Sequence, residues 1–124
     1  RGWENVSLVQ ADAATPPISG ADAVLSTFVT SLFPDPEAVV GRWCELAETV
    51  VLASFAPRGS RPANAALWAF TRLSTELFDA SGTDAIAQLD RRTAAARSAL
   101  EASMDRVGSG TYVFGTVVVS AGYR

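Results

Sequence analysis

The chain has no histidine and no lysine, and only one of its 124 residues is cysteine. Without histidine it cannot supply a Ser-His-Asp triad, a histidine general base or a histidine metal ligand. A single cysteine excludes an internal disulfide and a zinc site built from a cysteine cluster. Without lysine, the serine–tyrosine–lysine chemistry of short-chain reductases is impossible, which weakens the case for a nicotinamide-dependent enzyme.

The one cysteine, Cys44, lies in a helical pattern next to Trp43 and near Leu46. Free cysteine is among the most often buried residue types and packs as a small apolar side chain. We therefore expect Cys44 to lie in or near the core rather than to act as a nucleophile.

Strong charge and long apolar runs are also missing. The net charge is −3 and the ten cations, all arginine, form no basic cluster, so duplex nucleic acid is not an expected partner. No apolar run reaches the roughly 18 residues of a membrane span, and no signal peptide is visible. With 48% hydrophobic residues and moderate charge, the sequence is typical of a globular domain, and the cytoplasm is its expected location.

The sequence does contain short apolar runs of the kind found in buried parallel strands. They lie at residues 6–10, 23–26 and 49–55, and residues 111–123 have the β-branched and aromatic content of a long final strand. Residues 12–20, rich in proline and small polar residues, form a connection. We expect the first three runs to be parallel and adjacent in one sheet, with the final strand antiparallel.

Helical patterns alternate with these runs. Asp35 is a good N-cap, Pro36 suits the first helical position and Glu37 complements the helix dipole, so a helix begins there. Two more helices are expected, one over residues 62–78 and one that starts at residue 83 or 84, whose apolar stripe reaches Leu100 and whose end the sequence leaves open.

The alternation predicts one α/β domain over residues 1–124 with three layers, a mostly parallel sheet between helices. Residues 104–107 are expected to be a last helical turn or a short strand. Gly108-Ser109-Gly110 is expected to be a turn. Arg58 and Arg61 are expected in a solvated loop at the ligand side of the sheet.

In this order the pieces resemble the C-terminal two-thirds of a class I S-adenosylmethionine-dependent methyltransferase. The resemblance rests on residues 5–13, the connection that follows, residues 20–28, the helix start at 35–38 and the final strand with its preceding turn. It covers nearly the whole chain and is similar in style to the small-molecule ubiquinone and menaquinone C-methyltransferases. It implies a Rossmann-like methyltransferase sheet, N-terminally truncated and mostly parallel with an antiparallel final strand. The implied activity is transfer of a methyl group from S-adenosylmethionine to a small-molecule acceptor, as part of a longer chain.

The resemblance also implies site residues. In the family, an acidic residue and the small residue after it hold the adenine, and here these are Asp12 and Ala13. It places Thr27 beside the methionine portion of the cofactor, with Ser26 and Phe28 as further candidates at the same strand end. The alternative for each is structural: Asp12 caps a turn, and the other residues end a strand or pack under the next helix.

The family pattern is incomplete in this chain. The glycine-rich loop and the acid that binds the ribose hydroxyls would lie upstream of residue 1. Gly108-Ser109-Gly110 opens no helix, so it fails the context of a nucleotide-binding loop. We expect half a cofactor site, weak or no S-adenosylmethionine binding, no methyl transfer by this chain alone, and self-association through an open strand edge near residues 6–10.

A function outside catalysis also stays open: the chain would then be a non-catalytic α/β interaction module or an inactive truncated paralogue. No catalytic residue can be assigned, because methyl transfer depends largely on aligning a nucleophile with the methyl carbon.

Overall fold

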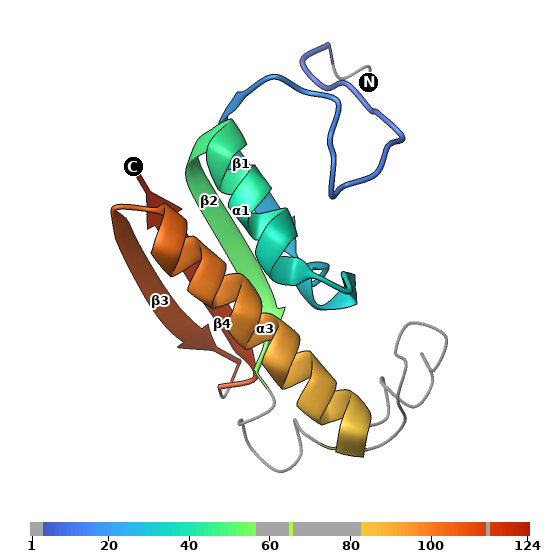
Figure 1. Cartoon of the computed structure of the whole chain (residues 1–124), viewed down its shortest axis with the longest axis vertical. Helices are drawn as coiled ribbons and strands as arrows, with labels where there is room; N and C mark the ends of the chain where they lie inside the picture. The colour runs from blue at the N-terminus through green and yellow to red at the C-terminus, as the bar shows by residue number, and fades with distance from the viewer. Residues whose placement is uncertain (1–3, 57–64, 66–82, 114) are drawn as a thin grey trace.

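Helices and strands alternate in the computed structural model, which describes residues 4–56, 65, 83–113 and 115–124 (Figure 1). The helix expected over residues 62–78, and Arg58 and Arg61, lie outside these residues. The elements are β1 (Ala21–Thr27), η1 (a 3-10 turn, Thr30–Leu32), α1 (Pro36–Leu46), β2 (Ala47–Phe55), α3 (Thr83–Ser103), β3 (Arg106–Tyr112) and β4 (Val117–Tyr123).

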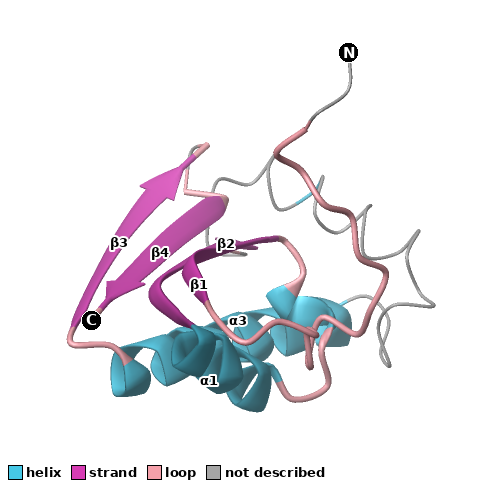
Figure 2. Cartoon of the chain, turned by 90° about the horizontal axis from the view of Figure 1, so that it is seen from above, coloured by secondary structure: helices cyan, strands magenta, loops and turns pink. Residues whose placement is uncertain are grey.

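The four strands form one mixed sheet in the order β1-β2-β4-β3. β1 is parallel to β2, whereas β4 is antiparallel to both β2 and β3. Both α1 and α3 lie on the same face of this sheet (Figure 2). The prediction of a mostly parallel, three-layer Rossmann-like sheet is therefore wrong: the described part is a two-layer α/β structure with a mixed sheet. One reason is the connection between β3 and β4, which is so short that it allows only an antiparallel hairpin.

Residues 6–10 form no strand, which corrects a second prediction. Their large apolar side chains are exposed, with Leu8 at 96% and Val9 at 66%. A short apolar run becomes a strand only where another strand pairs with its backbone, and none of the described strands pairs with this segment. The edge strands of the described sheet are therefore β1 and β3, and residues 6–10 form no edge of it.

The C-terminal segment folds as an antiparallel hairpin of two strands, so the bounds of the strand predicted over residues 111–123 are wrong, whereas the predicted antiparallel final strand is confirmed as β4. Gly108-Ser109-Gly110 lies inside β3 instead of forming a turn. The chain reverses around Gly115, whose φ of 82° is one that glycine adopts readily. Thr116 strengthens this turn by donating from Oγ1 to the carbonyl of Val113 at 2.7 Å.

Local sequence signals place the other elements correctly. The Asp35 carboxylate accepts a hydrogen bond from the backbone N–H of Ala38 at 3.0 Å, and Pro36 is the first residue of α1. The strands predicted at residues 23–26 and 49–55 are β1 and β2, and α3 begins at Thr83 as expected.

The core lies between the two helices and the sheet. Its centre includes Val40, Cys44, Val50 and Leu100, all with 0% exposure, so the prediction of a buried Cys44 is confirmed. Gly122 on β4 lets α3 come close, because a Cβ there would lie 2.7 Å from Met104 and 2.8 Å from Leu100.

The strand register sorts the remaining side chains between the two faces. Ser26, Leu52, Ser120 and Ser109 form one row across the sheet on the face that the helices cover. The next row of side chains lies on the opposite face. It begins at Leu25, which is 72% exposed, and continues across β2 and β4, where its side chains are partly buried. No described helix covers that second face (Figure 2).

Candidate functional site

Asp12 forms a tight turn in the connection before β1. Its Oδ1 accepts a hydrogen bond from the backbone N–H of Ala14 at 2.9 Å, and its carbonyl accepts one from Thr15 at 3.1 Å. This is the Asx turn that aspartate commonly makes. The carboxylate is exposed, and its other oxygen, Oδ2, is the one that could meet a ligand.

Ala13 is fixed to α1 by a tryptophan. The indole Nε1 of Trp43 donates to the Ala13 carbonyl at 2.9 Å, and the Trp43 side chain is otherwise buried. A buried indole N–H needs such an acceptor. Phe33 packs edge-on against the indole, with ring centroids 5.9 Å apart. The turn at Asp12–Ala13 is thereby held against the helix.

A hollow of about 310 Å³ lies between this turn and the N-terminal half of α1. Its walls are mostly apolar, with two charged side chains. They comprise Ala14, Thr15, Phe33, Pro34, Asp35, Ala38, Val39 and Arg42. Asp12 and Ala13 directly precede this lining in the sequence.

The candidates at the end of β1 point to different faces. Ser26 is 4% exposed and lies on the helix-facing side, where its Oγ has no hydrogen-bond partner. Thr27, the next residue, is exposed and lies on the opposite face of the sheet. Alternation along a strand makes it impossible for both side chains to enter one pocket.

Phe28 leaves the strand with a φ of 59°, a left-handed conformation that is uncommon for a bulky residue. Its backbone N–H donates to Ala53 at 2.7 Å, and its ring stacks on Phe55 with centroids 4.5 Å apart. These two contacts hold the turn. Next to it the hydroxyls of Thr30 and Ser54 lie 3.2 Å apart and are buried.

The five predicted residues thus divide into separate groups. Asp12 and Ala13 lie beside α1, Ser26 points under the helices, and Thr27 and Phe28 lie at the uncovered side of the sheet. None of them lines the hollow. Their cofactor roles remain predictions.

Sequence reasoning missed the wall residues that the structure adds. Phe33 and Ala38 flank the helix start that the sequence did indicate, so this segment offered a signal. A second hollow lies under α3, and no sequence signal indicated it. It depends on which side chains the strand register places opposite the helix.

The described part of the chain holds no group of three or more cysteine, aspartate or glutamate side chains that could bind a metal ion. No helix in the same residues is long and apolar enough to cross a membrane.

Neither a family model nor a curated protein matches this chain. A solved structure described as a possible exported protein from Bordetella parapertussis is similar, with a TM-score of 0.58 and 16% sequence identity. The match covers 92% of this chain but only 42% of that one. At this identity the similarity concerns the fold alone, and the chain spans less than half the length of its structural neighbour.

Proposed function

We propose that this chain contributes the adenosine-binding part of an S-adenosylmethionine-dependent methyltransferase that acts on a small-molecule acceptor, within a longer chain. The observation that carries the proposal is the hollow beside the Asp12–Ala13 turn, about 310 Å³ in volume. The sequence resemblance assigns adenine binding to those two residues.

The size and walls of the hollow suit part of the cofactor. Ligand pockets span roughly 300–1,000 Å³, so this one matches a nucleoside better than the whole of S-adenosylmethionine. Phe33 and Val39 offer apolar contact to a flat ring. Asp12 Oδ2 would accept a hydrogen bond from the exocyclic amine of adenine. S-adenosylmethionine would supply the transferred methyl group, and the acceptor and the rest of the site would come from elsewhere in the protein.

The test uses adenosine as the probe. Titration followed by nuclear magnetic resonance is expected to shift the amide signals of Ala14, Thr15 and Phe33. Asp12→Asn keeps an oxygen for the Ala14 N–H but replaces the second carboxylate oxygen by a donor. Losing that one hydrogen bond is expected to weaken binding by about two- to tenfold, since it is worth roughly 0.5–1.5 kcal/mol.

A second pair of variants checks the location. Ala38→Leu fills the hollow and should abolish the shifts, whereas Ala102→Leu, the same change at an exposed position on α3, should leave them unchanged. Adenosine binding unaffected by both Asp12→Asn and Ala38→Leu would refute the proposal. The expected cytoplasmic location stays a prediction.

A second candidate function is a non-catalytic interaction module. The observation that favours it is the outer edge of β1, which no described strand covers, together with the 72% exposure of Leu25 on that strand. An uncovered edge strand is a template for pairing with another chain.

A further inference from the structure

A second hollow, of about 220 Å³, lies between α3 and the sheet. Its floor consists of Leu52 and Ser54 on β2 and Val118 and Ser120 on β4. Serine side chains are too short to fill the space below the helix. Further along α3, Gly122 allows tight packing instead. The hollow therefore begins where small serine side chains take the place of large apolar ones on the helix-facing side of the sheet.

Three polar residues on α3 line the hollow, namely Asp90, Thr93 and Arg97. Thr93 lines it, and its Oγ1 is buried with no hydrogen-bond partner. This Oγ1 has almost no accessible surface, so Thr93 lines the hollow with the other atoms of its side chain.

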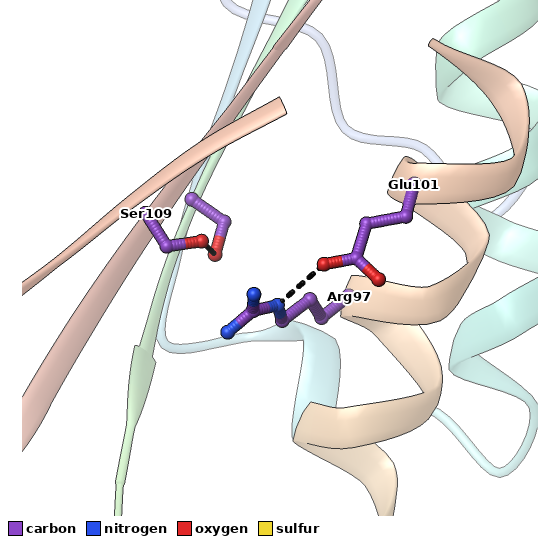
Figure 3. A network of polar contacts seen from close by, with 4 residues as sticks. Arg97, Glu101 and Ser109 are labelled. Carbon is purple, nitrogen blue, oxygen red and sulfur yellow. Dashed lines mark hydrogen bonds and ion pairs between the residues drawn. The ribbon is translucent and has the colours of Figure 1, made fainter. Parts of the chain in front are cut away.

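Arg97 stands at the rim on the same helix. Its Nε donates to Glu101 at 2.8 Å, and both side chains are about half exposed. Figure 3 shows the guanidinium extending from α3 toward the strand that carries Ser109, with its two terminal nitrogens on that side. Ser109 and Ser120 share a hydrogen bond there at 3.0 Å. The ion pair with Glu101 thus orients Arg97, a lining residue of the hollow, with its terminal nitrogens on the side of β3.

We propose that this hollow binds a short-chain aliphatic monocarboxylate, with its carboxylate on Arg97 and its chain between α3 and the sheet. This site is separate from the hollow beside α1 and does not depend on the methyltransferase proposal.

Size and charge select this class of ligand. At about 30 Å³ for each water-sized group, the volume takes roughly seven non-hydrogen atoms, which is the size of butanoate or pentanoate. Leu52 and Val118 give the alkyl chain apolar contact. Asp90 in the lining and Glu101 at the rim are both acidic, so they oppose a doubly charged group such as phosphate more strongly than a monocarboxylate, which the terminal nitrogens of Arg97 attract.

The experiment titrates the chain with sodium butanoate, and with butan-1-ol and butylammonium as probes that keep the alkyl chain but change the head group. We expect binding in the millimolar range for so small a ligand, with amide shifts at Ser54, Thr93 and Ser120. Butan-1-ol should bind at least about fivefold more weakly and butylammonium not at all.

Variants test the contact between the carboxylate and Arg97. Arg97→Gln should weaken butanoate binding by about tenfold, whereas the matched change Arg91→Gln, at an exposed position on the same helix, should alter it less than twofold. Thr93→Val removes a hydroxyl that has almost no accessible surface, so it serves as a second control and should alter binding less than about twofold. Equal binding of butan-1-ol, or equal effects of the two arginine variants, would overturn the proposal.

Discussion

At the scale of single residues, side chains act on their immediate backbone and solvent. Asp35 fixes where α1 begins, because its carboxylate satisfies the Ala38 N–H that the first helical turn leaves without a partner. The side chain of Cys44, in contrast, is buried away from water. Burial raises the pKa of its thiol, and the charge of Arg124 partly opposes that rise.

Replacing Asp35 by alanine removes the cap. We expect the free energy of unfolding to fall by about 0.5–2 kcal/mol, measured by urea titration, because the Ala38 N–H loses its acceptor. Asp35→Asn keeps a side-chain oxygen and should lose much less. An equal loss in both variants would show that the charge matters and the hydrogen bond does not.

The Cys44 thiol makes stability depend on pH at the alkaline end. Because its pKa in the folded state lies above the ordinary 9.0, the unfolded chain releases this proton first as the pH rises. Its contribution is complete below pH 9.0 and is lost as the pH rises toward the folded-state pKa. Comparing unfolding free energies at about pH 8 and about pH 10, we expect a larger fall for the natural chain than for Cys44→Ala. Equal falls would contradict this expectation.

At the scale of elements, contact between α3 and the sheet depends on where β4 carries its small residues. Gly122 admits Leu100 and Met104 to close contact, whereas Gly108 on β3 faces open space. Gly122 therefore has a role in packing, whereas no neighbouring side chain among the described residues restricts the residue at position 108.

Gly122→Ala should reduce stability by about 1–3 kcal/mol, because the added methyl group lies inside the contact distance of two core side chains. Gly108→Ala is the matched control, and we expect it to be neutral or slightly stabilising in thermal unfolding. If both variants unfold at the same temperature, α3 does not pack on β4 as described.

At the scale of the whole molecule, the described sheet has one face covered by helices and two edge strands, β1 and β3. Two copies could pair β1 antiparallel about Val24, which sets Asp22 of one copy opposite Ser26 of the other and brings no like charges together. The apolar Leu25 lies on that strand and is 72% exposed.

We therefore expect concentration-dependent self-association in sedimentation velocity. Leu25→Lys should weaken it by about tenfold or more, because a charge on an edge strand opposes pairing. Leu8→Lys changes a side chain that is 96% exposed but lies outside the sheet, and it should have little effect. A monomer at all concentrations, or equal effects of the two changes, would count against pairing through β1.

Sequence alone was sufficient where the cause is local. The start of α1 follows from Asp35 and Pro36, the burial of Cys44 from its place in a helical stripe, and β1 and β2 from their apolar runs. These signals act over a few residues, through capping, backbone geometry and hydrophobic periodicity.

Only the tertiary structure decided which segments pair and what the pairing places together. The run at residues 6–10 has the composition of a strand but no partner, and Gly108 and Gly110 have the composition of a turn yet lie in a strand that β4 holds in place. Likewise, the register that sets Ser120 beside Leu52 and under α3 is fixed by backbone hydrogen bonds between distant segments. Such pairings depend on the whole chain at once, so no local pattern could determine them.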